Sequence, residues 1–258
     1  MKILVCVKQV PDMESRFKPN GAGTWYDEAD LAWRMNEYDE YAVEQAVKLK
    51  EQLGDAPEVT VLSIGPDRVV EAIKKALAMG CDRGVHVQDP AALLKDPWQI
   101  AGIIANYARE QGFDLIFTGM QSQDRGSAQV GVTVAELLGI ASTTTLVGFA
   151  YDDGLITAKR ELEGGIKGVV KLRTPALVTC QLGLNIPRYP TLPNIMKAKK
   201  KEIQAIAVAD LLKDEALEVT ASFHPPAKKG GGVVLEGDVN DLADRLLAIL
   251  KDKTSVLR

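Results

Sequence analysis

The sequence is poor in the residues from which disulfides and metal sites are built. Its 258 residues include only three cysteines and two histidines. Cys6, Cys81 and Cys180 are odd in number, far apart in the chain and outside any C-x-x-C pair, a pattern typical of reduced thiols in a cytosolic compartment. Two histidines are too few for a histidine-rich metal site. We therefore expect a cytoplasmic protein that holds no metal.

Long hydrophobic runs and an excess of positive charge are also missing. No segment approaches the roughly 18 apolar residues that cross a bilayer. The apolar run between Lys2 and Lys8 is too short for the core of a signal peptide. The formal net charge is -4, which argues against nucleic-acid binding. The sequence predicts a protein that is neither embedded in a membrane nor bound to nucleic acid.

The chain does have enough apolar material for a large core, because 46% of its residues are hydrophobic. In the first half, short apolar runs typical of strands alternate with amphipathic stretches typical of helices. We expect strands at 3–7, 59–64, 84–87 and 115–118, and helices at 36–49, before 79, at 98–111 and from 127 to 138. This alternation predicts an α/β fold with a mostly parallel sheet and helices on both faces.

The pattern changes after Gly139. Gly-containing turns separate three strand-like segments, 143–150, 155–162 and 167–172, which predicts extra antiparallel hairpin strands. One more apolar strand is expected at 176–180. A linker at 225–232 then separates a domain of residues 1–224 from an arm of residues 225–258. The helix expected at 239–250 is too short to fold alone, so it packs either on another chain or back on its own domain.

The stretch from Asp114 to Gly139 is the best candidate for a binding site. A short apolar strand leads through a loop with Gly119 and Gly126 at its ends into a helix that Gly139 can stop. A helix that begins after such a loop gathers free N–H groups at the positive end of its dipole, which suits a phosphate. The alternative is an ordinary strand–helix turn in which Ser127 is the N-cap. Neither G-x-G-x-x-G nor G-x-x-x-x-G-K-[ST] is present.

Four segments resemble one known family. PRYPTLPNIMKAKKKEI at 187–203 is similar to the signature of the small (beta) subunit of electron transfer flavoproteins. Three other segments support this resemblance: KILVCVKQVPD at 2–12, ALAMGCDRGVHV at 76–87 and RELEGG at 160–165. The resemblance covers residues 1 to about 205, and the arm matches more in layout than in sequence.

This resemblance implies an electron carrier without substrate turnover and therefore without catalytic residues. Its sheet would be of the adenine-nucleotide-binding type. It would pair as a heterodimer with an alpha subunit that holds most contacts to a redox-active FAD. It would take electrons from flavin dehydrogenases, such as acyl-CoA or amine dehydrogenases, and pass them to a quinone-linked oxidoreductase. The resemblance also implies a soluble protein of the bacterial cytoplasm, with the arm packed on the alpha subunit.

The family pattern further implies a structural AMP in this chain. Carried over by position, its contacts would come from two strand ends, from the segment 36–39 and from the loop 119–130. The residues are Cys6, Asn36, Glu37, Tyr38, Asp39, Ile64, Gly119, Gln121, Asp124, Arg125, Gly126, Ser127, Ala128, Gln129 and Val130. Ala128 and Val130 stand where AMP-binding members often have Asn and Thr, so backbone amides would carry more of the phosphate binding. The sequence from Ser127 to Gly131 also resembles electron-bifurcating members in part, in which a second FAD takes the place of AMP.

The proline-rich segment at 185–201 corresponds to the family's partner-recognition loop. Three prolines stiffen it, which lowers the entropy lost on binding. The residues expected to dock on dehydrogenases are Tyr189, Leu192, Pro193, Ile195, Met196 and Lys197, with Leu192 as the anchor. The lysines at 197 and 199–201 would steer the chain towards an acidic partner.

A different class of protein remains as an alternative. A free-standing enzyme or sensor that binds an adenine nucleotide could use the same fold. It would need a nucleophile, a base or metal ligands beside the loop. Asp124 and Arg125 are the charged candidates there.

Overall fold

The computed structural model describes residues 1–54, 56–222, 224 and 232–255. The contacts within the chain divide it into two units, Met1–Phe223 and His224–Arg258. Each is described by itself below.

The larger unit is built on a nine-stranded sheet with the order β11-β5-β4-β1-β6-β10-β7-β8-β9. Its strands are β1 (Lys2–Cys6), β4 (Glu58–Gly65), β5 (Arg83–Gln88), β6 (Leu115–Gly119), β7 (Ala141–Asp152), β8 (Leu155–Glu161), β9 (Lys167–Arg173), β10 (Ala176–Cys180) and β11 (Ile203–Ala207). Every neighbouring pair from β11 to β7 is parallel. The hairpin strands β8 and β9 extend the sheet antiparallel at one end, as the turn residues predict.

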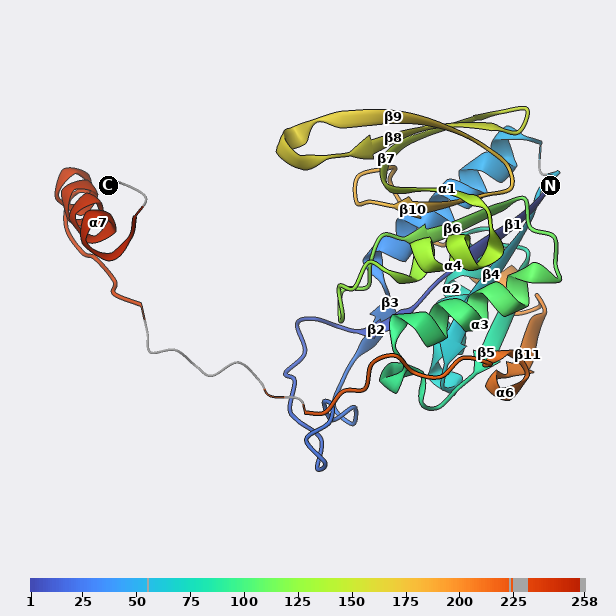
Figure 1. The fold of residues 1–258 in the computed structure, drawn as a ribbon, viewed down its shortest axis with the longest axis horizontal. Coiled ribbons are helices and arrows are strands. Elements are labelled where there is room, and N and C mark those ends of the chain that lie inside the picture. Colours follow the sequence, from blue (N-terminus) through green and yellow to red (C-terminus); the bar gives the residue numbers. More distant parts are fainter. Residues whose placement is uncertain (55, 223, 225–231, 256–258) are drawn as a thin grey trace. The chain divides into compact units, whose positions relative to one another are not determined.

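Helices cover both faces of the parallel part (Figure 1). On one face lie α1 (Glu37–Gln52), α2 (Val70–Met79) and α5 (Leu192–Ala198), and on the other α3 (Pro97–Arg109), α4 (Val130–Leu138) and α6 (Val208–Leu211). Three 3-10 turns are η1 (Asp67–Val69), η2 (Ala92–Leu94) and η3 (Glu163–Gly165). The fold is therefore the predicted α/β arrangement with helices on both faces.

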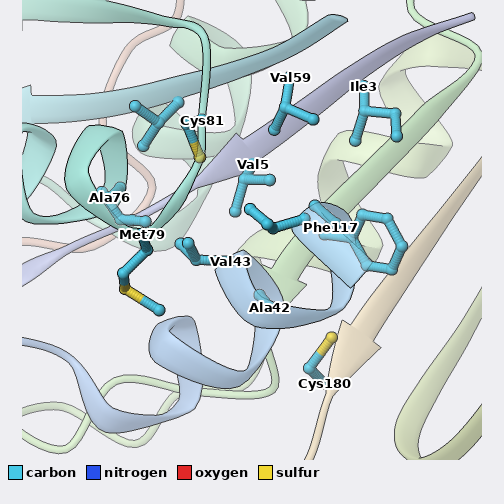
Figure 2. Packing of buried hydrophobic residues seen from close by; sticks show 14 of the residues in the cluster. Ile3, Val5, Ala42, Val43, Val59, Ala76, Met79, Cys81, Phe117 and Cys180 are labelled. Carbon is cyan, nitrogen blue, oxygen red and sulfur yellow. The ribbon is translucent and has the colours of Figure 1, made fainter. Parts of the chain in front are cut away.

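The apolar run of β1 explains why this strand is central. Because side chains alternate along a strand, Ile3 and Val5 enter the core under α1 and α2, whereas Leu4 and Cys6 enter the core under α3 and α4. Figure 2 shows Ile3 and Val5 with Phe117 in the first of these cores. A strand buried on both faces needs apolar residues at every position, which is what the sequence has.

Two parts of the fold were not predicted. A short antiparallel ribbon pairs β2 (Gln9–Pro11) with β3 (Trp33–Met35), two segments for which the sequence predicted no strand. The edge strand β11 also lacked a signal, because it has only one partner, β5, and no fully buried residue. Within the described ranges, no helix is long and apolar enough to cross a membrane.

The smaller unit contains α7 (Val239–Lys253), which begins at the N-cap Asp238. The carboxylate of Asp238 accepts hydrogen bonds from the backbone N–H of Asn240 and Asp241. None of the described residues of this helix is buried. Most of the linker predicted at 225–232 lies outside the described residues.

Candidate functional site: a cavity at the carboxyl ends of the central strands

The carboxyl ends of β4, β1 and β6 open into one cavity with an empty volume of about 1050 Å³, open solvent included. After β1 the chain builds β4 and β5 on one side and then β6 and β10 on the other. The cavity therefore lies where the strand order reverses, which is the position at which open α/β sheets bind nucleotides. Its lining comes from segments 6–9, 36–39, 62–69, 92–104 and 118–131.

One wall of the cavity is the start of α4. The helix begins at Val130 after Gln129, and no side chain caps its N-terminus. Ser127 is not the N-cap, so the interpretation of this stretch as an ordinary capped turn is wrong. The first amides of a helix have no acceptor within the helix. Left uncapped beside a cavity, such amides can donate hydrogen bonds to an anion.

Two residues with positive φ shape the loop before this helix. Gly126 has φ 62° and Ala128 has φ 54°. A Cβ atom on Gly126 would meet only Gln121 Oε1, at 3.9 Å. The requirement for glycine within this chain therefore comes from the backbone conformation rather than from crowding.

Gly131 brings the start of α4 directly onto the sheet. A Cβ atom at this position would lie 2.7 Å from Thr118 Oγ1 and 2.9 Å from Thr179 Cγ2. Because there is no side chain, the helix can approach the ends of β6 and β10 closely. The free amides are thereby held at the edge of the cavity.

Segment 36–39, which we call the clamp, holds the loop after β6. Asn36 donates from Nδ2 to the carbonyl of Gln121 (2.9 Å) and accepts at Oδ1 from the N–H of Gln123 (3.0 Å). Glu37 accepts from the Gln123 side chain, and the hydroxyl of Tyr38 accepts from the Gln121 side chain. These polar atoms are engaged with the loop, so the clamp positions it.

Asp39 is a buried, ionisable member of the clamp, with 5% of its surface exposed; Asn36 is buried as well. The carboxylate of Asp39 accepts hydrogen bonds from the N–H of Lys8 (2.7 Å), which lies just after β1, and from the N–H of Gly119 (3.1 Å), the last residue of β6. Burial raises the pKa of Asp39 to about 7, and the two backbone N–H groups offset part of that rise. A side chain on Gly119 would collide with this carboxylate and with Tyr38 Cβ, 2.7 Å away.

Four cationic residues line the cavity, but each has a partner in the protein. Lys8 pairs with Asp124 at 2.7 Å and Lys95 with Asp89 at 2.9 Å. Arg68 pairs with Glu28 at 2.9 Å. The guanidinium of Arg125 donates to the carbonyls of Leu93 and Lys95 and lies over the ring of Trp25. These contacts hold the cations at the rim of the cavity. The backbone amides at the start of α4 are further donors on the cavity side, because no side chain caps that helix.

The cavity brings together most of the predicted cofactor-binding residues. Those that line it are Cys6, Asn36, Asp39, Ile64, Gly119, Gln121, Arg125, Ser127, Ala128, Gln129 and Val130. Glu37, Tyr38, Asp124 and Gly126 lie outside the lining. Sequence reasoning missed Lys8 and Arg68, and also the wall formed by η2 and the start of α3. A usable signal was that η2 follows the carboxyl end of β5, which lies at the same edge of the sheet.

A second candidate surface is the docking segment, residues 185–201. Arg188 anchors it to α1 through a bidentate pair with Glu44 (2.8 and 3.0 Å) and a further pair with Glu51. Its hydrogen bonds with the two glutamates raise the pKa of Arg188, and the same contact lowers the pKa of Glu51. Asn185 donates to the carbonyl of Tyr41. The base of the segment is therefore fixed to the domain.

Above this base the docking segment exposes apolar side chains. Leu192 is 72% exposed and Tyr189 is 92% exposed, with Ile195 and Met196 beside them. The helix α5 begins at Leu192, with Pro193 in its first turn and Thr191 as the N-cap. Exposed apolar groups on a fixed base are typical of an interaction site. The ammonium of Lys201, the last residue of the segment, is turned to the domain instead, where it donates to the carbonyls of Leu77 in α2 and of Cys81 just after it.

Comparison with known proteins assigns the family. The family model described as Electron transfer flavoprotein domain matches residues 23–211. The electron transfer flavoprotein subunit beta of Bradyrhizobium diazoefficiens is 40% identical over 259 residues, which cover 100% of both chains. The Bacillus subtilis protein of the same name is 36% identical over 263 residues, which again cover 100% of both chains. The Homo sapiens protein of that name is 38% identical over 254 residues, which cover 96% of this chain and 98% of the human one. The chain therefore belongs to the electron transfer flavoprotein family, among its beta subunits.

Proposed function

We propose that this beta subunit works as an electron carrier that does not turn over a substrate of its own. It pairs with an alpha subunit that holds most contacts to a redox-active FAD. It takes electrons from flavin dehydrogenases, such as acyl-CoA or amine dehydrogenases, and delivers them to a quinone-linked oxidoreductase. The observation that carries this proposal is the combination of an uncapped helix start beside the cavity with a separate, anchored segment that exposes apolar side chains.

The cavity would hold AMP as a structural group. Its phosphate would receive hydrogen bonds from the amides at 127–131, because no side chain caps the start of α4 and these residues line the cavity. The adenine would lie against Cys6 and Ile64 at the ends of β1 and β4, where backbone groups can meet its polar edge and apolar side chains its faces. AMP supplies no redox chemistry, so the role of these residues is to bind and orient it.

The free-standing enzyme is the weaker hypothesis on chemical grounds. The side chain of Asp124 is only 2% exposed and is paired with Lys8. Arg125 is engaged with two carbonyls of the η2 segment. A general base or a transition-state clamp has to reach the reacting atoms, and both of these charged groups are committed elsewhere.

The docking segment would seat Leu192 in an apolar pocket of the dehydrogenase, with Tyr189, Pro193, Ile195, Met196 and Lys197 around it. Since Arg188 fixes its base, little ordering is needed on binding. The arm would bury the apolar side of α7 (Leu242, Leu246, Ile249 and Leu250) on the alpha subunit. A single amphipathic helix of this length needs such a surface to be stable.

The test is co-expression with the alpha subunit from the same source, followed by acid release and chromatography of the nucleotides. One AMP and one FAD per heterodimer is the expected result. Two FAD and no AMP would identify the electron-bifurcating form instead. A stable heterodimer that releases one FAD and no second nucleotide would refute nucleotide binding by this chain.

A further inference from the structure

The side chain of Arg125 joins two walls of the cavity. Arg125 lies in the loop between β6 and α4, which forms one wall, and η2 with the residues after it belongs to another. The guanidinium donates hydrogen bonds to the carbonyl of Leu93 in η2 and to that of Lys95 just after it (3.4 Å). These carbonyls stand at the end of a helical turn, where arginine side chains commonly bind. A charged group of the loop is therefore fixed to η2.

The ring of Trp25 also keeps this guanidinium on η2 rather than in the cavity. The Cζ atom of Arg125 lies 4.4 Å from the centre of that ring, a distance at which a cation and an aromatic ring attract each other. To reach a phosphate, Arg125 would have to give up both hydrogen bonds and the ring, and two carbonyls would lose their donor. Arg125 therefore connects parts of the protein to one another.

The loop that carries Arg125 is held by other contacts as well. The neighbouring residue Asp124 pairs with Lys8, just after β1, at 2.7 Å. Asn36 of the clamp binds the backbone of the loop at two positions, Gln121 and Gln123. Loss of the Arg125 hydrogen bonds would therefore leave the loop in place, together with the start of α4 that follows it.

The η2 segment, residues 89–96, has fewer restraints. It is anchored where it begins, by a backbone hydrogen bond from Asp89 to the end of β4, and where it ends, by Asp96 at the start of α3. Between these two residues, within the described part of the chain, hydrogen bonds to another segment come from Arg125 alone. The ion pair of Lys95 is with Asp89, which belongs to the same segment. The η2 segment is therefore the wall that can move.

We propose that the η2 segment moves to admit and release the nucleotide, and that Arg125 sets the rate by holding the segment closed. This inference rests on the proposed binding of AMP and makes Arg125 a positioning residue rather than a phosphate ligand. A contact that has to break before the nucleotide can pass in either direction slows entry and release alike. Its loss should speed both, with a much smaller change in affinity.

The test uses the heterodimer of the full chain with its alpha subunit. Release is measured by chasing bound radiolabelled AMP with unlabelled AMP, and affinity by equilibrium dialysis of nucleotide-free heterodimer; the rate constant of entry follows from the two. Arg125→Met, which keeps the apolar stem, should release AMP about tenfold faster or more, because charged hydrogen bonds are lost, with affinity within about threefold of the wild type. Arg125→Lys keeps a charged donor and should lie between the two.

Arg109→Met is the matched control. Arg109 also donates to a carbonyl, that of Leu137 in α4 (2.9 Å), and it lies at the far end of α3, away from the cavity. The variant makes the same change of charge and should exchange AMP like the wild type. Hydrogen–deuterium exchange of the backbone at 90–95 should rise in Arg125→Met and stay unchanged in Arg109→Met. Melting temperatures show that the variants are folded, and Arg125→Lys carries the test if Arg125→Met does not fold.

Adenosine, which lacks the phosphate, separates the two roles of Arg125. The ratio of the affinities for AMP and adenosine should be the same in the wild type and in Arg125→Met. A variant that loses affinity for AMP but not for adenosine would make Arg125 a phosphate ligand and overturn the inference. Faster release without faster entry, or wild-type rates, would overturn it too. A wild-type heterodimer that keeps its FAD but binds no AMP would remove the proposed AMP site, and the inference with it.

Discussion

Asp39 should make the stability of this chain fall as the pH rises towards neutrality. The pKa of its carboxyl is raised from 3.8 to about 7, mainly because burial disfavours the charged form. The folded state therefore holds a proton that the unfolded state has released. The stabilising contribution is complete below pH about 4 and is lost as the pH rises to about 7. Three pKa units correspond to roughly 4 kcal/mol in the free energy of unfolding.

The variant Asp39→Asn isolates this effect. Its amide has one acceptor oxygen for the two N–H groups of Lys8 and Gly119, so relative to the carboxylate it loses a hydrogen bond worth about 1–3 kcal/mol. The excess stability of the wild type over the variant, measured by urea unfolding at intervals from pH 4 to pH 8, should shrink by roughly 4 kcal/mol. Other titrating groups are common to both proteins and cancel in the difference. A difference that stays flat across this range would refute the reasoning.

Asp96 provides a control of opposite sign. Burial raises the pKa of its carboxyl, but the backbone N–H groups of Gln99, Glu218 and Leu217 together outweigh this and leave the pKa lowered. Its contribution is present above pH about 4 and is lost as the pH falls further. The wild type should therefore lose its advantage over Asp96→Asn in acid rather than towards neutrality.

Three further changes test the cavity, the docking segment and the arm. Gly126→Val should lower nucleotide occupancy, because a β-branched residue is strained at φ 62°; Gly112→Val introduces the same strain at φ 65° away from the cavity and should lower stability alone. Leu192→Ala should reduce the affinity for the dehydrogenase about 10- to 100-fold, because it removes roughly 1.5–3 kcal/mol of apolar burial at the interface, and it should leave the flavin spectrum and the melting temperature of the heterodimer unchanged. A fall in melting temperature like that of a core Leu→Ala variant would contradict this. Truncation after Pro226 should leave the sheet folded and impair heterodimer formation; unchanged assembly would exclude a role for the arm.

The sequence predicted the elements whose signals are local. The continuous apolar run of β1 and the Gly139 stop of α4, with φ 67°, were both readable from residue patterns. The missed edge strand β11 takes its identity from pairing with β5, a contact between residues far apart in the chain.

The candidate site shows the same limit. The strand ends and the loop before α4 could be located, because the topology of a parallel sheet brings them to one edge. The partners of Asn36, Lys8 and Arg125 could not, since each bonds to a segment at least 30 positions away. These long-range contacts decide which polar groups face the cavity and which are hydrogen-bonded within the protein.

Helix α1 connects the two candidate surfaces. Its first turn carries Asp39 at the cavity, and its later turns carry Glu44 and Glu51, which hold Arg188 of the docking segment. With 16 residues it is roughly 24 Å long. Its length therefore sets the distance between the cavity and the base of the docking segment. Inserting one residue after Asp39 would turn both glutamates by about 100° and shift them by about 1.5 Å. The exposed residues of the docking segment can therefore change without moving its base, whereas a change in the length of this helix would move that base relative to the cavity.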